Sequence, residues 1–276
     1  MFYLILAIVS SALVSILMRL SEGRSKNNIS MLAMNYLMCS ILAAAFAGPD
    51  KLLPGGDGFG LTLGLGAIGG VCYLGSFMLL QWNIYKNGVV LPTTFMKLGV
   101  IIPTLLSIVV FGEKPRAIQV IGVVAAICAI ILMQGKGGQA KSTLLLVLLL
   151  VTTGFSNSMS KIFEEVAPAA LKNQFLFYIF GTALILCAII CIAKKQRLAP
   201  ADALFGLAIG IPNYLSSRFM LLSLAEIPAV VAYPSYSVAA IVLVALVGVV
   251  CFKEKLTRRK MIALGIILAA LVLLNV

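Results

Sequence analysis

The chain has 276 residues, of which 62% are hydrophobic and only 11% charged, about half the charged share of an ordinary soluble domain. Its 21 lysines and arginines outnumber its 9 acidic residues, giving a net charge of +12. Most of the basic residues lie in short connections between apolar runs, where they act as topology signals and headgroup contacts. The composition therefore excludes a large soluble domain and argues against nucleic acid as a partner.

Ten apolar segments follow one another along the chain, each near the roughly 17–25 residues needed to cross a bilayer core of about 30 Å. Backbone polar groups in lipid must be hydrogen-bonded within their own segment, so these segments are predicted to be helices. The first follows Met1 directly and is expected to be a mature span rather than a removed signal peptide. We predict an all-α membrane protein with ten transmembrane helices, at about residues 2–20, 30–47, 60–82, 89–111, 116–134, 143–162, 172–193, 203–225, 228–252 and 257–275.

Polar side chains are unevenly distributed among these spans. The first, third, fourth, sixth, eighth and ninth carry serine, threonine, asparagine and tyrosine, whereas the fifth offers only Gln119 and the tenth has nothing polar between Lys260 and Asn275. Desolvating a hydroxyl or amide costs a few kcal/mol unless it finds a partner, so these side chains should face other helices or a wet cavity. The simpler alternative is that they bond to their own helix or hold neighbouring helices together, for about 0.6–2 kcal/mol.

Glycine and proline punctuate the spans. Glycines at 60/64 and 66/70 form GxxxG pairs, for which close helix packing is favoured over a phosphate-binding loop. Prolines remove a backbone hydrogen bond and free a carbonyl, so they mark positions where helices can break or bend. Four of them fall within or near the starts of spans four, eight and nine: Pro92, Pro103, Pro212 and Pro234.

The chain also repeats itself. The run Phe77–Leu80 recurs as Phe219–Leu222, and the same offset of 142 residues pairs Arg19 with Lys161. One residue out of step, FGEKP at 111–115 faces FKEKL at 252–256. We therefore predict two five-span repeats, residues 1–135 and 142–276, that together form one transmembrane domain. An odd number of spans gives the halves opposite orientations, which is the inverted repeat common among secondary transporters.

Ten spans, two five-span halves and a Glu-Lys turn between the fourth and fifth span of each half resemble the EamA-type branch of the drug/metabolite transporter superfamily. The resemblance covers essentially the whole chain, although the second half has Lys253-Glu254 where Gly-Glu is usual. It implies transport, and a central cavity lined mainly by the six spans that carry the polar side chains, with the fifth and tenth further out.

Charge counts predict an orientation in the membrane. Connections after odd-numbered spans hold 14 lysines and arginines, whereas those after even-numbered spans hold 5. The positive-inside rule then places the odd connections in the cytoplasm and both termini outside, while the resembled family is usually drawn with its termini inside. The five basic residues assigned to even connections are Lys51, Lys114, Arg116, Lys161 and Lys172.

Two basic residues lie inside predicted spans. Lys97 is about eight residues, or ~12 Å, into span four, and Arg218 about fifteen residues, or ~22 Å, into span eight. A charge at the centre of a lipid-facing helix costs about 3 kcal/mol, so we expect the two to flank the membrane midplane and at least one to line the cavity. The alternative is that each extends along its helix toward the headgroups.

All nine acidic residues lie in connections or at span ends, so no protein anion is expected at midplane depth. Either Lys97 is uncharged when the site is empty, because burial disfavours the charged form, or the substrate supplies the anion. Arg218 keeps its charge, and its planar fork suits a carboxylate or phosphate. We therefore hypothesise alternating-access transport of a small anionic or zwitterionic metabolite, such as an organic acid, an amino acid or a phosphorylated compound. The predicted substrate-binding residues are Lys97, Arg218, Tyr214, Asn213, Asn157, Tyr73, Thr94, Tyr236, Ser11 and Trp82.

Other functions fit the sequence less well. Small multidrug exporters that resemble half of this chain use a membrane-embedded glutamate, and spans one and six have none, which argues against export of drug-like cations. An enzyme would need a histidine, cysteine or carboxylate cluster at one depth, and the chain has no histidine. A non-transporting scaffold subunit stays open. We expect no cofactor and no metal, a small-molecule substrate and the lipid bilayer as partners, a possible homodimer, and a bacterial cytoplasmic membrane as location.

Overall fold

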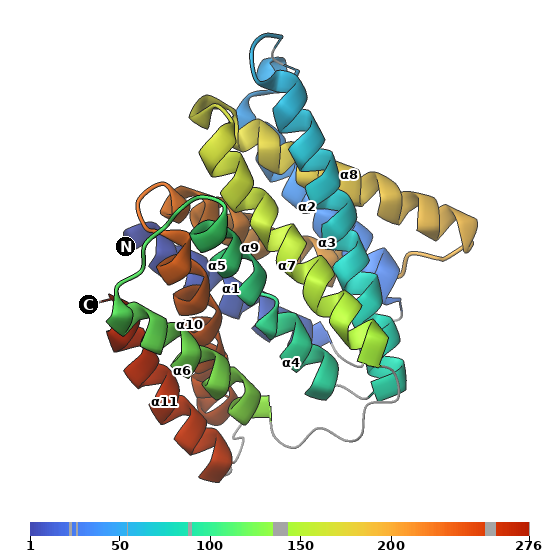
Figure 1. Ribbon diagram of the computed structural model, residues 1–276. Coiled ribbons are helices and arrows are strands. Elements are labelled where there is room, and N and C mark those ends of the chain that lie inside the picture. Colours follow the sequence, from blue (N-terminus) through green and yellow to red (C-terminus); the bar gives the residue numbers. More distant parts are fainter. Residues whose placement is uncertain are drawn as a thin grey trace. The chain divides into compact units, whose positions relative to one another are not determined.

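Figure 1 shows a computed structural model of the chain, which describes residues 1–21, 24–25, 27–53, 55–87, 90–134, 143–251 and 258–275. That part of the chain is helical and contains no strand, as predicted. Two short 3₁₀ turns, Pro49–Lys51 and Ala169–Leu171, precede α3 and α8. The α-helices are α1 (Phe2–Ser21), α2 (Asn28–Ala47), α3 (Phe59–Asn87), α4 (Val90–Leu98), α5 (Ile101–Val109), α6 (Ala117–Gln134), α7 (Thr143–Val166), α8 (Lys172–Ala193), α9 (Pro200–Leu224), α10 (Ala229–Val250) and α11 (Arg258–Asn275).

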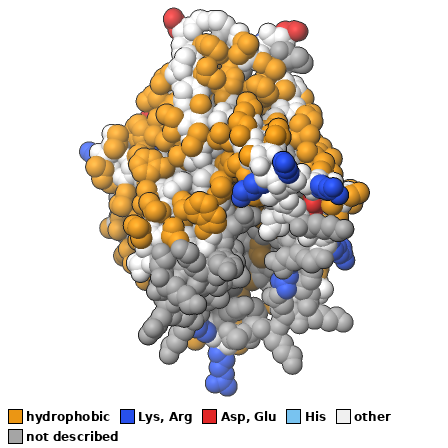
Figure 2. Space-filling model, turned by 90° about the vertical axis from the view of Figure 1, so that its right-hand side faces the viewer, with side chains coloured by type: hydrophobic (Ala, Val, Ile, Leu, Met, Phe, Trp, Pro, Cys, Tyr) orange, Lys and Arg blue, Asp and Glu red, His pale blue; other side chains and the backbone are white. Residues whose placement is uncertain are grey.

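Six of the described helices are long and apolar enough to cross a membrane: α1, α2, the Phe59–Leu80 part of α3, α7, α8 with its preceding turn, and α10. Three shorter apolar helical stretches cover Phe95–Val109, Ala117–Leu132 and Met261–Asn275. Hydrophobic side chains dominate the described surface on the face shown in Figure 2. Large apolar side chains are exposed on the surface of the described chain, for example Ile192 with an exposed fraction of 76%. Such side chains are stable in contact with lipid. The chain is therefore an integral membrane protein, while the count of ten spans stays a prediction.

The fourth predicted span is not one helix. α4 ends at Leu98, and α5 begins at Ile101. Pro103 has no N–H to bond the carbonyl of Gly99, which instead accepts from the N–H of Ile102 at 3.1 Å. The sequence placed a span over 89–111 and marked Pro103 as a position where it could break or bend, and the helix is interrupted next to this proline. Pro212 and Pro234, by contrast, lie inside α9 and α10, which continue through them.

The chain divides into two compact units. The first unit comprises Met1, Gly75–Lys161 and Ser223–Val276, and the second comprises Phe2–Leu74 and Ile162–Leu222, so α3, α7 and α9 contribute to both. In the first unit α6 packs along α11, and in the second α2 packs along α8 (Figure 1). The 142-residue offset relates the two members of each pair. The repeat boundaries at 1–135 and 142–276 stay a prediction.

Glycines allow close helix contacts within the second unit. A Cβ added at Gly70 of α3 would lie 2.5 Å from the backbone oxygen of Ile179 in α8, and one at Gly66 would lie 2.5 Å from the Cβ of Tyr178. Close packing is thus confirmed for the 66/70 pair, whereas Gly60 and Gly64 face open space. A second pair with the same spacing, Gly206 and Gly210 of α9, packs on α2 and was not singled out from the sequence.

Candidate functional site

Arg218 of α9 is held by neutral groups of the second unit. Its Nη1 donates to Oδ1 of Asn173 at 2.5 Å and to the hydroxyl of Tyr214 at 3.1 Å. The guanidinium carbon lies 4.1 Å from the centre of the Phe46 ring, within the range of a cation–π interaction. No carboxylate of the described chain pairs with it. The positive charge of Arg218 is therefore solvated by dipoles and an aromatic face, with no formal counter-charge.

The contacts of Arg218 lie near the ends of two helices. Asn173 is the second residue of α8, and Phe46 is the last but one of α2. The guanidinium consequently lies level with the end of α2 and the start of α8, while its depth in a bilayer stays a prediction. Arg218 is also only six residues before the end of α9 at Leu224.

A chain of hydrogen bonds joins three helices of the second unit. The hydroxyl of Tyr73 in α3 donates to Oδ1 of Asn213 in α9 at 2.9 Å. Nδ2 of Asn213 donates to Oδ1 of Asn35 in α2 at 3.2 Å. Both amides are buried, and each finds the partner that buried polar groups require. Asn35 was missed from the sequence because span two was not counted among the polar ones.

Aromatic rings surround these polar groups. The ring of Phe180 in α8 lies 5.9 Å from that of Tyr73 and 6.3 Å from that of Tyr214, both edge-to-face. The ring centre of Tyr36 in α2 lies 5.8 Å from that of Tyr73, and Tyr36 is completely buried. The structure thus brings together four of the predicted site residues, Tyr73, Asn213, Tyr214 and Arg218. Tyr214 and Asn213 are buried, while Tyr73 and Arg218 are partly exposed.

Ser11 also belongs to the second unit and is partly exposed on α1. Its backbone carbonyl accepts from the hydroxyl of Ser15 at 3.2 Å, which is the bonding of a serine to its own helix that the sequence offered as an alternative. A hydrogen bond between the Ser11 side chain and the aromatic cluster is not found among the described residues.

Lys97 belongs to the first unit and lies in the last turn of α4, directly before the break. Helix C-termini carry partial negative charge and stabilise cations within their last turn. The carbonyl of Lys97 accepts only a long bond, 3.4 Å, from the N–H of Val100. Within the part of the chain that the structure describes, its side chain makes no ion pair. This helix end falls in predicted span four, where Pro103 marks a position at which the helix can break or bend.

The other predicted residues of the first unit have different environments. Asn157 of α7 accepts at its backbone oxygen from the hydroxyl of Tyr233 at 2.7 Å. Tyr236 of α10 is partly exposed. Trp82 is 56% exposed, as expected of a tryptophan at a membrane interface. The side chain of Thr94 lies outside the described residues.

An ion pair in the first unit was not predicted. Nζ of Lys161 lies 3.0 Å from Oε1 of Glu113, and the side chain of Lys161 is 4% exposed. Because α7 continues to Val166, Lys161 is a buried helix residue and not a residue of an even-numbered connection. This corrects the charge count for those connections from 5 to 4. The ammonium also lies 5.6 Å from the centre of the Phe111 ring.

Glu113 makes two further contacts. Its carboxylate accepts from the N–H of Ala229 at 2.9 Å and from that of Val230 at 3.0 Å, which caps the start of α10. Burial would raise the pKa of Glu113, but the N–H groups of Val230 and Ala229 and the ammonium of Lys161 outweigh it and hold that pKa below its usual value. The FGEKP turn was recognised from the sequence, but its partners were not.

Comparisons with known proteins agree with this fold. The model of the EamA-like transporter family matches residues 1–134 and 140–276. An uncharacterised protein of Haemophilus influenzae is 24% identical over 271 residues, which are 92% of this chain and 91% of that protein. A protein known from its crystal structure is similar with a TM-score of 0.77 over 99% of this chain and 94% of its own, at 15% identity, which indicates a shared fold. The chain is therefore a membrane protein that belongs to the EamA-like transporter family.

Proposed function

We propose that this protein is a secondary transporter that moves a small anionic or zwitterionic metabolite across a bacterial cytoplasmic membrane by alternating access. The observation that carries the proposal is the environment of Arg218, whose charge is held by Asn173, Tyr214 and the Phe46 ring. A guanidinium does not lose its proton in proteins, so it stays positive inside this apolar unit. An anionic group on the cargo would supply the missing counter-charge.

The geometry of the guanidinium favours a carboxylate or phosphate. The hydrogen bonds that hold Arg218 in the described chain use only Nη1. The edge formed by Nε and Nη2 therefore remains available for two parallel hydrogen bonds to one anionic group. The Phe46 ring, whose centre lies 4.1 Å from the guanidinium carbon, limits the freedom of the fork, which lowers the entropy lost when the anion binds.

The neutral hydrogen-bonding groups near Arg218 suit cargo molecules that share an anionic group but differ in their uncharged parts. The Tyr73–Asn213–Asn35 chain contains no ionisable carboxylate or imidazole. It can therefore keep the same charge over the physiological pH range. Organic acids, amino acids and phosphorylated compounds all share the anionic group that Arg218 would bind. We propose that Arg218 selects the charge and that the neutral groups select the remainder of the molecule.

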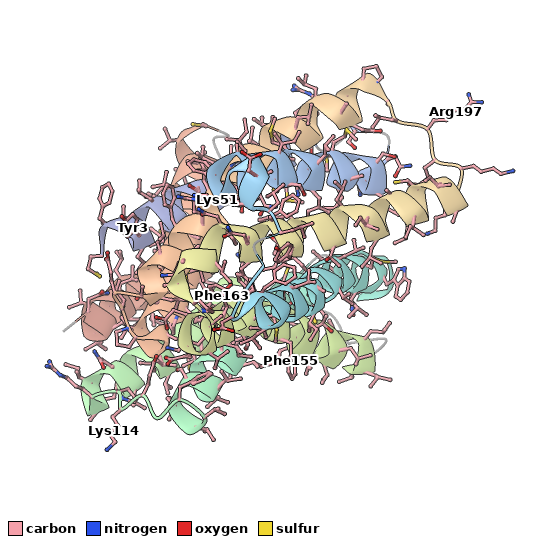
Figure 3. The ribbon with its side chains drawn as sticks, turned by 90° about the horizontal axis from the view of Figure 1, so that it is seen from above. Tyr3, Lys51, Lys114, Phe155, Phe163 and Arg197 are labelled. Carbon is pink, nitrogen blue, oxygen red and sulfur yellow. The ribbon has the colours of Figure 1, made fainter. Side chains whose placement is uncertain are left out.

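Thermal stabilisation of the purified full-length protein tests the proposal. The probes are citrate, L-glutamate and glucose 6-phosphate, with tetraphenylphosphonium as a lipophilic cation. We expect at least one anionic probe to raise the Tm of the wild type, and the effect to be lost in Arg218→Gln and weakened in Arg218→Lys, which keeps the charge without the fork. Lys114→Gln is the matched control, because this exposed lysine points away from the helices (Figure 3).

Two results would oppose the proposal. Stabilisation by tetraphenylphosphonium alone would favour export of cationic compounds. Equal stabilisation of the wild type and Arg218→Gln by the anions would show that the guanidinium does not bind them. Uptake of the stabilising probe into proteoliposomes, with and without a pH gradient, then distinguishes transport from binding by a scaffold subunit.

A further inference from the structure

The start of α10 is anchored by a residue from a different connection. α10 begins after Pro228, which offers no side-chain cap. Glu113, from the turn between α5 and α6, supplies the cap by accepting from the N–H groups of Ala229 and Val230. A carboxylate is the favoured group at a helix N-terminus because the first N–H groups lack partners and carry partial positive charge.

α7 anchors the same stretch at two positions. Lys161 pairs with the capping carboxylate at 3.0 Å, and the backbone oxygen of Asn157 accepts from the hydroxyl of Tyr233 at 2.7 Å. Asn157 and Lys161 are four residues apart, so they lie on one face of α7. Residues 229–233 of α10 are therefore attached to α7 at both ends. They are also buried, none being more than 5% exposed.

Pro234 follows this attached stretch directly. It has no N–H to bond the carbonyl of Val230, and its ring crowds that carbonyl, so the helix is weakest at this point. The next residue, Ser235, is 1% exposed, and its hydroxyl has no hydrogen-bond partner in the described chain. α10 thus has a firmly held first turn followed directly by a proline, and the predicted substrate residue Tyr236 lies beyond that proline.

We propose that Glu113 is a positioning residue for transport: with Lys161 it fixes the first turn of α10 on α7, so that α10 bends at Pro234 instead of shifting as a whole. Opening the Glu113–Lys161 pair would leave a buried ammonium without its anion and two helix N–H groups without an acceptor, so the pair stays closed while the helix bends. The link to transport rests on the proposed function, whereas the anchoring and the bending do not.

Hydrogen exchange of the full-length protein in lipid nanodiscs tests the anchoring without any cargo. We expect slow exchange of the amides of residues 229–233 in the wild type and exchange faster by about tenfold in Glu113→Gln, with α6 and α11 unchanged. Glu113→Asp, which keeps the carboxylate, should restore most of the protection, and Lys161→Met should resemble Glu113→Gln. Lys114→Gln, in the same turn but exposed, should leave exchange unchanged.

A distance measurement tests the bending. In a cysteine-free background, nitroxides on cysteines introduced at Phe155 of α7 and Leu246 of α10, both exposed in the first unit, report the position of α10 beyond Pro234. The broad distribution expected for the wild type should narrow in Pro234→Ala. Glu113→Gln should displace the whole distribution, and Glu113→Asp should restore it.

The proposal would be overturned by exchange that rises equally along α10 and α6 in Glu113→Gln, or by a distribution that Pro234→Ala leaves unchanged. Neither result would affect the anion-binding proposal, which depends on Arg218 in the second unit. Conversely, failure of every anionic probe to stabilise the protein would leave the anchored first turn of α10 intact.

Discussion

At the scale of single residues, charge alone does not reveal which basic side chains are structural. Lys97, Arg218 and Lys161 all lie on apolar helices, yet only Lys161 pairs with a carboxylate among the described residues. The sequence pointed to Lys97 and Arg218 because they lie inside predicted spans, where a charge is costly. It missed Lys161 because its partner Glu113 is 48 positions earlier, in a connection, and pairing across that separation depends on packing.

The capping carboxylate should make stability depend on pH. The folded pKa of Glu113 is lower than its unfolded value, so its contribution is complete above the unfolded pKa, about 4.3, and is lost as the pH falls through the folded pKa. We expect the Tm difference between the wild type and Glu113→Gln to be constant near neutral pH and to shrink below about pH 4. A Tm difference between the two proteins that stays constant from about pH 6 to about pH 3 would contradict this expectation.

The buried amide of Asn213 should matter more than that of Asn157. Asn213→Ala removes the acceptor of Tyr73 and the donor to Asn35, and we expect it to lower the free energy of unfolding by about 1–2 kcal/mol. Asn157→Ala is the matched control, because its bond to Tyr233 uses the backbone oxygen and should change stability by less than about 0.5 kcal/mol. Unfolding by SDS in mixed micelles measures both values. Equal losses in the two variants would rule out the side-chain network.

At the scale of helices, local sequence signals predicted where the apolar segments lie better than they predicted whether each segment is one unbroken helix. Apolar length located the segments, and the glycines at 66 and 70 correctly indicated close packing. The break between α4 and α5 combines Pro103 with Gly99, whose added Cβ would lie 3.2 Å from the backbone oxygen of Leu150 in α7. Pro234 also removes a backbone hydrogen bond, but α10 continues through it. Residues 229–233, directly before it, are held by Glu113 and α7. Whether a proline breaks a helix or only weakens it is therefore decided by neighbours that the local sequence does not contain.

The glycine contacts between α3 and α8 predict opposite effects for two similar substitutions. Gly70→Ala places a Cβ 2.5 Å from the backbone oxygen of Ile179, so the helices must separate, and we expect a loss of about 1–3 kcal/mol. Gly64→Ala lies on the same helix with nothing within 4 Å, and it should be neutral or stabilise by about 0.5–1 kcal/mol. Thermal unfolding of both purified variants measures the difference. A smaller Tm for Gly64→Ala than for Gly70→Ala would show that this packing is absent in the bilayer.

At the scale of the whole molecule, composition predicted the class of protein and the sequence offset suggested its internal symmetry. The two compact units do not coincide with the two halves of the chain, since each combines segments from both. Sequence self-similarity marks residues related by the repeat, whereas compactness depends on which helices pack together. This is why the offset could pair α2 with α8 and α6 with α11 but could not indicate where the units divide.

Orientation in the membrane is also a property of the whole chain. With Lys161 removed from the connections, the count of basic residues favours cytoplasmic odd-numbered connections more strongly than before. Arg197 and Lys114, both exposed and labelled in Figure 3, lie in an odd and an even connection. In a cysteine-free background, Arg197→Cys should react with a membrane-impermeant maleimide only after permeabilisation, and Lys114→Cys in intact cells. The reverse pattern would place the termini inside.

The exposure of Trp82 has a practical consequence, because it is the sole tryptophan of the chain. All indole fluorescence comes from this one position, on the outer surface of α3. Brominated phospholipids quench such emission only when their bromines come close to the ring, so varying the bromine position along the acyl chain would measure how deep this part of α3 sits. The intrinsic fluorescence of Trp82 would thus report the membrane depth of this part of α3 without an added label.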